Sequence, residues 1–167
     1  MKKNHTGFTL IELLAVVMII AMLTSVALPQ YRKSVQRAES MEALVNLRTI
    51  FDAAKRYRSA NSEAPMKLNG LDVSFFDADT PEASSFNIGN YHYAFSDWGV
   101  SACRISGSGS YANTYCLDMY YTYRLGDTKY KDLLICASKS QKYSWLCDSL
   151  KTDELPDGTA VIGTELD

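Results

Sequence analysis

Apolar residues follow two different patterns in the first third of this chain of 167 residues. A first stretch, Phe8 to Leu28, is apolar almost throughout and carries a single charge, Glu12. Its 21 residues would cover about 31 Å as a helix, close to the ~30 Å hydrocarbon core of a bilayer. A secretory signal has a shorter apolar core of roughly 7 to 15 residues. The stretch therefore predicts a transmembrane helix.

Beyond Pro29 the pattern changes to one apolar residue every three or four positions, which predicts an amphipathic helix that ends near Ser59. A proline inside a helix removes one hydrogen bond and kinks the helix. Hydroxyls of Thr24 and Ser25 in the preceding turn are expected to bond the freed carbonyls. We therefore predict one long kinked helix, Phe8 to about Ser59. The apolar positions after the proline are Tyr31, Val35, Ala38, Met41, Leu44 or Val45, Leu47, Phe51, Ala54 and Tyr57.

The remaining residues, 60–167, have the turn residues and alternation that are typical of a small antiparallel sheet. In the last candidate strand we expect Leu133, Ile135 and Ala137 to face the core. In the candidate strand that contains Tyr121, two sets of residues alternate along the chain. We therefore expect this strand to be half-buried, with one face toward the core. Three or four strands packed on the second half of the helix would form an α+β head. The candidate strands are 91–95, 102–106, 115–124 and 130–137.

Glu12 requires an explanation, because a carboxylate inside a spanning helix costs a few kcal/mol or more and is by default a functional hypothesis. The run Gly7-Phe8-Thr9-Leu10-Ile11-Glu12 resembles the processing signature of the type IV pilin family, which includes the pseudopilins of type II secretion. This resemblance implies that a prepilin peptidase removes a leader, residues 1–7, and N-methylates Phe8. It also implies an assembly role for Glu12, the fifth residue of the mature chain. The alternative is a glutamate that snorkels at the membrane edge.

Elementary electrostatics agrees with an assembly role. Cleavage creates an α-ammonium at Phe8, and a helix N-terminus adds roughly half a positive charge. Glu12 can neutralise its own N-terminus or that of a neighbour, and such a pair is worth far more in a low-dielectric environment than in water. A shift of one turn between parallel helices would bring each Glu12 to the Phe8 amine of the next subunit.

The family resemblance further implies a pilin-like fold, a location and partners. The precursor would cross the bacterial inner membrane once through residues 8–28, and residues 29–59 would continue the helix outside it. The mature subunit would then join an extracellular or periplasmic filament. Its partners would be other pilin subunits, the peptidase and an inner-membrane assembly platform. In the family, the stretch before the proline, here about Ala21 to Pro29, can unwind during assembly.

Four cysteines lie beyond the membrane segment, where an exported head meets an oxidising environment. Two disulfides are expected, and three pairings are possible. The sequential pairing is favoured because its members are close in sequence and bracket candidate loops. The alternative, a zinc site, is disfavoured because structural zinc sites prefer cysteines two to four residues apart. The sequential pairs are Cys103 with Cys116 and Cys136 with Cys147.

Charge is distributed unevenly: residues 29–58 carry seven basic and three acidic groups, and residues 59–167 carry eight basic and fifteen acidic groups. An acidic head argues against nucleic-acid binding, which needs a basic surface. One interpretation is that these charges belong to an ordinary solvated surface, because surface ion pairs usually contribute little to stability. Alternatively, the basic stretch, Arg32 to Arg58, contacts the acidic heads of neighbouring subunits.

Enzymatic function has little support in the sequence. His92 is the only histidine beyond the first helix, and it has no serine elbow, metal-ligand spacing or phosphate loop around it. We therefore expect no catalytic residue, no metal and no cofactor. The sequence predicts a type IV pilus subunit. A pseudopilin of a type II secretion system is the alternative within the family, and a monomeric membrane-anchored adhesin is the alternative outside it.

Overall fold

The structure is a computed structural model that describes residues 8–75, 79, 82–107, 114–121, 134–138 and 141–150. The chain divides into two compact units, residues 1–38 and residues 39–167. Each unit is described by itself. The first consists of the beginning of helix α1, and the second contains the remainder of that helix and all of the sheet.

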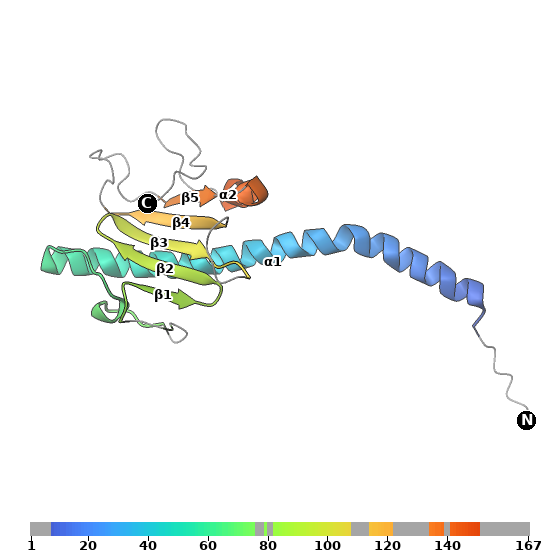
Figure 1. Cartoon of the computed structure of the whole chain (residues 1–167), viewed down its shortest axis with the longest axis horizontal. Coiled ribbons are helices and arrows are strands. Elements are labelled where there is room, and N and C mark those ends of the chain that lie inside the picture. Colours follow the sequence, from blue (N-terminus) through green and yellow to red (C-terminus); the bar gives the residue numbers. More distant parts are fainter. Residues whose placement is uncertain are drawn as a thin grey trace, which may run out of the picture. The chain divides into compact units, whose positions relative to one another are not determined.

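Helix α1, Leu10–Asn61, is 52 residues long and continues through Pro29 (Figure 1). The predicted single long helix is confirmed, and its ends lie two residues from the predicted ones. The kink at Pro29 stays a prediction. Methionines and leucines favour a helix on both sides of the proline, and proline is tolerated where its ring can be accommodated by a local bend.

The hydroxyls before the proline do not bond the carbonyl that it frees. Thr24 Oγ1 donates to the carbonyl of Ile20 at 2.8 Å, and Ser25 Oγ donates to that of Met22 at 2.7 Å. The carbonyl left without a partner by Pro29 is four residues back, on Ser25. A Ser or Thr hydroxyl in a helix reaches back by three or four residues. The hydroxyls of Thr24 and Ser25 therefore cannot bond the freed carbonyl, because the Ser25 carbonyl does not lie three or four residues before either of them. The prediction that they bond the freed carbonyl was wrong.

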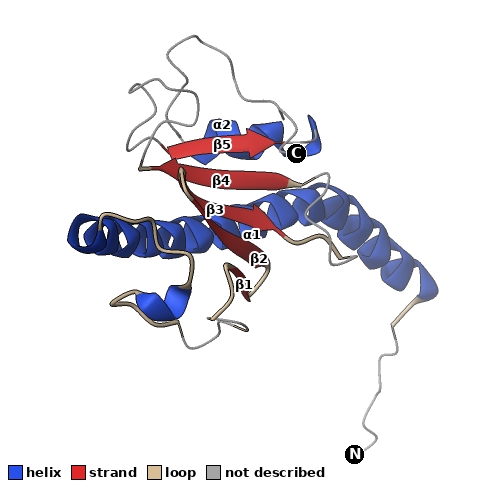
Figure 2. Ribbon diagram, turned by 60° about the vertical axis from the view of Figure 1, so that its left-hand side comes forward, coloured by secondary structure: helices blue, strands red, loops and turns tan. Residues whose placement is uncertain are grey.

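Five antiparallel strands form one sheet in the order β1-β2-β3-β4-β5 (Figure 2). The predicted α+β architecture is confirmed, with one or two more strands than expected. Sequence analysis missed β1 and the short helix α2. The strands are β1 Ser85–Ile88, β2 Tyr91–Ser96, β3 Gly99–Arg104, β4 Tyr115–Tyr120 and β5 Leu134–Ser138, and the short helices are η1 Leu68–Gly70, η3 Gln141–Tyr143 and α2 Ser144–Leu150.

The second half of α1 packs on one face of the sheet and builds the core with it (Figures 1 and 2). Leu44 is buried whereas Val45 is 61% exposed, so the helix turns Leu44 toward the sheet. Met41, expected on the same apolar face, is 47% exposed. The helix contributes Ala43, Leu44, Leu47, Ile50, Phe51 and Ala54 to the core.

The core-facing positions of β5 are shifted by one residue from the predicted ones. Its core-facing residues are Leu134 and Cys136, which pair with Met119 and Leu117 of β4. Residues that pair across strands lie on the same face, so Ile135 and Ala137 lie on the opposite face. Position 133 is outside the described residues. A continuous apolar run fits period-2 alternation in either phase, so the sequence could not fix the phase.

Strand β4 is buried on both faces, not on one. Leu117 faces the helix, and the opposite face carries Cys116, Asp118 and Tyr120, all less than 9% exposed. Trp98 stacks on the Tyr120 ring with centroids 4.8 Å apart, and a disulfide holds Cys116. Trp98 precedes Gly99, where a side chain would meet the backbone carbonyl of Met119. This glycine lets β3 begin close to β4.

Candidate functional site

Large apolar side chains of the first helical unit are exposed to a degree that is unusual in a globular protein. One 18-residue window of α1 has a mean hydropathy of 2.5, and helix α1 is long and apolar enough to cross a membrane. Contiguous apolar surfaces of this kind mark membrane or protein contacts. The exposed residues up to the proline are Phe8, Leu10, Ile11, Leu13, Leu14, Val16, Val17, Met18, Ile19, Ile20, Met22, Leu23, Val26 and Leu28.

Glu12 closes the N-terminus of this helix. Its Oε2 accepts hydrogen bonds from the backbone N–H and from the hydroxyl of Thr9, both at 2.8 Å. In return, the Glu12 backbone N–H donates to Thr9 Oγ1 at 3.4 Å. This reciprocal pattern is a capping box, which satisfies two helix-end donors. Glu12 therefore has a local structural role that is independent of assembly.

The capping box leaves the carboxylate capable of a second interaction. Both hydrogen bonds that Glu12 accepts go to Oε2, and a carboxylate has about four lone-pair sites on its two oxygens. Oε1 can therefore accept from an ammonium group while Oε2 caps the helix. Phe8, which would carry that ammonium after cleavage, lies directly before Thr9 and is 87% exposed.

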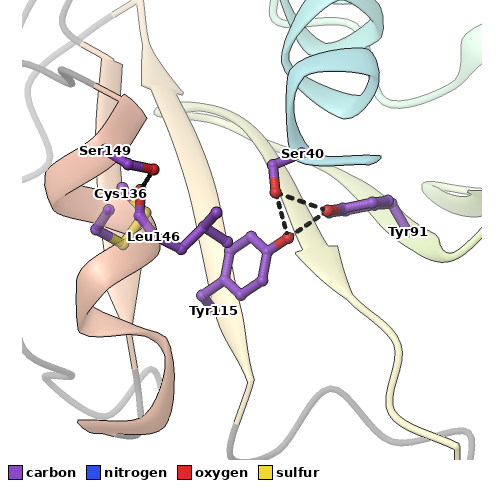
Figure 3. Close-up of a disulfide and its surroundings, with 7 residues drawn as sticks. Ser40, Tyr91, Tyr115, Cys136, Leu146 and Ser149 are labelled. Carbon is purple, nitrogen blue, oxygen red and sulfur yellow. Dashed lines mark hydrogen bonds between the residues drawn. A yellow bond between two sulfur atoms is a disulfide. The ribbon is translucent and has the colours of Figure 1, made fainter. Parts of the chain in front are cut away.

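Two disulfides hold the head. Cys103 is bonded to Cys116, its direct cross-strand partner between β3 and β4. Cys136 on β5 is bonded to Cys147 on α2, beside Leu146 and Ser149 (Figure 3). The bonds join the pairs that are sequential along the chain. The second bond attaches a seven-residue helix that is too short to be stable by itself.

Non-reducing peptide mapping of the exported protein is expected to recover two cross-linked peptides, one with Cys103 and Cys116 and one with Cys136 and Cys147. Reduction should lower the free energy of unfolding of the head by about 3 kcal/mol for each bond, because loops of this size have that closure entropy. Membrane insertion should be unchanged, since we expect it to depend on the apolar residues 8–28. Free thiols at all four positions, or crossed peptides, would contradict the pairing.

Three buried hydroxyls meet where the helix joins the sheet. Ser40 Oγ and Tyr115 Oη are 2.8 Å apart, and Tyr91 Oη bonds both Tyr115 Oη and Ser40 Oγ (Figure 3). Ser40 and Tyr115 are fully buried. Burial raises the pKa of the Tyr91 and Tyr115 hydroxyls, so all three groups stay protonated and each can donate one bond. The cluster links α1, β2 and β4.

His92 follows Tyr91 in β2 and makes a polar contact on the opposite face of that strand. Its Nδ1 is 2.8 Å from Asn87 Oδ1, and the Asn87 side chain donates to Asp79. Burial lowers the pKa of the His92 imidazole, while the Asp79 carboxylate acts in the opposite direction. An amide partner does not activate a histidine for nucleophilic catalysis. Within the described residues, no group of three His, Cys, Asp or Glu side chains could hold a metal.

Comparison with known proteins finds matches to a family model and to several bacterial proteins. A family model for the prokaryotic N-terminal methylation motif matches residues 2–28. Type II secretion system core protein G of Vibrio cholerae is 30% identical over 89 residues, 53% of this chain and 61% of that protein. Type IV major pilin protein PilA of Myxococcus xanthus is 43% identical over 56 residues, 34% of this chain and 26% of that protein.

The N-terminal segment of this chain thus carries the prokaryotic N-terminal methylation motif, and the chain is similar to a type IV pilin and to type II secretion core protein G. The matches span about three fifths of the length of protein G and about a quarter of the length of the pilin. The pilin-like fold rests on the long helix and the antiparallel sheet. The methylation motif covers Gly7, Phe8 and Glu12 and ends one residue before Pro29.

Two of the hydrogen-bonded groups described above, the capping box and the hydroxyl cluster, were not predicted from the sequence. The capping box has a recognisable signal, because Thr9 and Glu12 have the Thr-x-x-Glu spacing in front of an apolar run. The hydroxyl cluster has none. Ser40, Tyr91 and Tyr115 are far apart in the chain, and only the packing of the helix on the sheet brings them together.

Proposed function

We propose that this chain is a structural subunit of a type IV pilus filament. A prepilin peptidase would cleave between Gly7 and Phe8 and methylate the new N-terminus, and the subunits would then polymerise through their N-terminal helices. The observation that supports this most is the exposed apolar helix with Glu12 at its start, within the segment that matches the methylation motif. A membrane before assembly and neighbouring helices after assembly would both bury this surface.

Electrostatics supports the same assembly step. In a filament core the α-ammonium of Phe8 would be removed from water, and a buried charge needs a partner. Glu12 Oε1 accepts no hydrogen bond from the described residues, because the capping bonds use Oε2. The carboxylate of one subunit would therefore receive the ammonium of the next without giving up its cap.

The remaining elements of the proposal follow from the similarity to pilins and pseudopilins. The precursor would be anchored in the bacterial inner membrane, and the filament would be extracellular or periplasmic. Its partners would be further copies of the chain, the peptidase and an inner-membrane assembly platform. The relatives are structural pilins and pseudopilins, which supports a subunit without catalytic activity.

A pseudopilin of a type II secretion system is the second candidate. It is favoured by the extent of the matches, because protein G is matched over 53% of this chain and the pilin over 34%. A monomeric membrane-anchored adhesin is a candidate of another class. It would need the transmembrane helix but no carboxylate for a neighbouring N-terminus.

Electron microscopy of sheared surface fractions, with mass spectrometry of the filaments, tests the proposal. We expect filaments that contain this chain, with N-methylated Phe8 as its first residue. Gly7→Val should leave the uncleaved precursor in the membrane, because the peptidase must fit the residue before the cut. Gly107→Val is the matched control, since a Cβ there meets no atom of the described residues within 4 Å, and it should be processed normally.

The alternatives predict different outcomes of the same experiment. Loss of protein secretion on deletion, without surface filaments, would favour the pseudopilin. Processed or unprocessed monomers that never enter a filament would favour the adhesin. An intact Met1 in the mature protein, or cleavage at another position, would contradict the proposed maturation.

A further inference from the structure

A small cleft opens on the head between α1 and the turn that joins β1 to β2. It lies within the compact unit of residues 39–167 and has a volume of about 130 Å³. Pockets for drug-sized ligands measure roughly 300 to 1,000 Å³, so this cleft suits a single side chain. Its main lining residues are Glu39, Glu42 and Asn46 of the helix and Ile88, Asn90 and Tyr91 of the hairpin.

The two carboxylates of the cleft differ in their pairing. Glu39 Oε2 accepts a hydrogen bond from Arg104 Nη2 at 2.8 Å, and both side chains of this pair are less than one third exposed. Glu42 is exposed and forms no ion pair with any residue that the structure describes. Its negative charge reaches into the cleft, where it adds to the effect of burial in raising the pKa of Tyr93 to about 12. The cleft thus keeps one uncompensated negative charge.

The lining selects the chemistry of an occupant. A carboxylate with side-chain amides beside it binds a cationic group with N–H donors, and the guanidinium group matches a carboxylate with two parallel bonds. The apolar stem of a long basic side chain can lie along Ile88 and the tyrosine at the cleft wall. An arginine or lysine side chain from outside the subunit fits the charge, the size and the lining.

We propose that this cleft binds Arg37 of a second copy of the chain, an inference that rests on the proposed filament. A shift that brings Glu12 of one subunit to Phe8 of the next displaces parallel helices by four residues, or about 6 Å. Arg37 of the neighbour then lies level with position 41, between Glu39 and Glu42. With the same shift, Arg32 lies level with position 36 and Arg48 with position 52, beyond the cleft.

Charge reversal in the full-length protein tests the contact. Glu42→Lys should lower the yield of sheared filaments at least about tenfold, since juxtaposed like charges cost several kcal/mol and each 1.4 kcal/mol is a factor of ten. Arg37→Glu should do the same. The double variant, Glu42→Lys with Arg37→Glu, should recover at least half of the wild-type yield because it restores opposite charges.

Glu63→Lys is the matched control, because Glu63 is also an exposed glutamate but lies outside the cleft, and its yield should equal that of the wild type. Immunoblots of processed subunit and protease resistance of the head show whether each variant folds. If folded single variants assemble normally, or if the double variant recovers less than half of the yield, the contact with Arg37 is refuted. If the wild type forms no filament, the proposed function fails, independently of this contact.

Discussion

Glu12→Leu is expected to leave membrane insertion and cleavage intact and to abolish filament assembly. Leucine makes the helix more apolar, so insertion should be at least as efficient as in the wild type. The residues at the cut, Gly7 and Phe8, are unchanged. In the filament, however, the buried Phe8 ammonium would lose its carboxylate partner. Breaking a buried pair in this way costs roughly 3 to 5 kcal/mol, and the cost recurs at every subunit addition.

The capping box introduces a second effect of the substitution, which a matched variant separates. Leucine removes the bonds between Glu12 and Thr9, and losing a helix cap costs about 1 kcal/mol. Glu12→Gln keeps a side-chain oxygen that can accept the Thr9 N–H but removes the negative charge. If charge neutralisation is the role of Glu12, glutamine should fail in assembly almost as completely as leucine.

Quantitative immunoblots of membrane and sheared fractions measure both steps. The expected result is processed subunit in the membrane and none in sheared filaments for both variants. Normal filament yield from Glu12→Gln with loss from Glu12→Leu would assign the residue to helix capping alone. Normal yield from both variants would show that Glu12 is not needed for assembly, as expected for a monomeric anchor.

The sequence predicts those parts of the molecule that local chemistry determines. The apolar run of residues 8–28 and the 3.6-residue period after Pro29 define one helix, because no other arrangement satisfies so long a backbone in an apolar environment. Alternating tyrosines define β2 in the same way, since period 2 has a single interpretation when one face is polar. The processing motif is local as well, and the methylation-motif model matches it.

The missed features depend on contacts between distant segments. Strand β1 has only four residues and gains its structure from pairing with β2. The phase of β5 depends on its register with β4, because its own sequence is apolar at successive positions. Strand β4 was expected to be half-buried, but the stacking of Trp98 on Tyr120 and the Cys103–Cys116 bond cover its second face.

The residues of the candidate site also fall into those that the sequence identifies and those that only the fold brings together. Gly7, Phe8 and Glu12 could be named from the sequence because their proposed roles depend on order and spacing along the chain. The acidic cleft could not, because Glu39 and Glu42 become a site only when the β1–β2 turn packs beside them. Charge counting indicated an attraction between the basic stretch and acidic groups of residues 59–167, whereas both carboxylates of the cleft belong to helix α1.

Tyr115 is the residue of the head whose truncation is expected to cost most. Its side chain is fully buried, its ring lies against Tyr91 and Tyr143 at centroid distances of 6.2 and 5.4 Å, and its hydroxyl bonds Ser40. Tyr115→Ala would leave a large cavity, at a cost of about 3 to 5 kcal/mol for an aromatic side chain. It would also disrupt the hydroxyl cluster, so we expect a loss of about 5 kcal/mol.

Tyr115→Phe separates the ring from the hydroxyl. Phenylalanine keeps the volume but leaves Ser40 and Tyr91 with one partner fewer, which costs about 1 to 3 kcal/mol. The lower end is expected, because Tyr91 Oη already bonds Ser40 Oγ at 3.4 Å. Tyr31→Phe, at a site 68% exposed, is the control and should change the stability by less than about 0.5 kcal/mol.

Urea unfolding of the full-length protein in detergent can measure these differences, because both tryptophans, Trp98 and Trp145, lie in the head and their fluorescence reports its unfolding. The pH dependence gives an independent test. A tyrosine whose pKa is raised by folding stabilises the protein below its unfolded pKa of about 10 and loses this contribution as the pH rises further. The alkaline loss of stability should therefore be smaller in Tyr115→Phe than in the wild type. Equal costs for Tyr115→Phe and Tyr115→Ala would show that the hydroxyl cluster, not ring packing, holds the helix on the sheet.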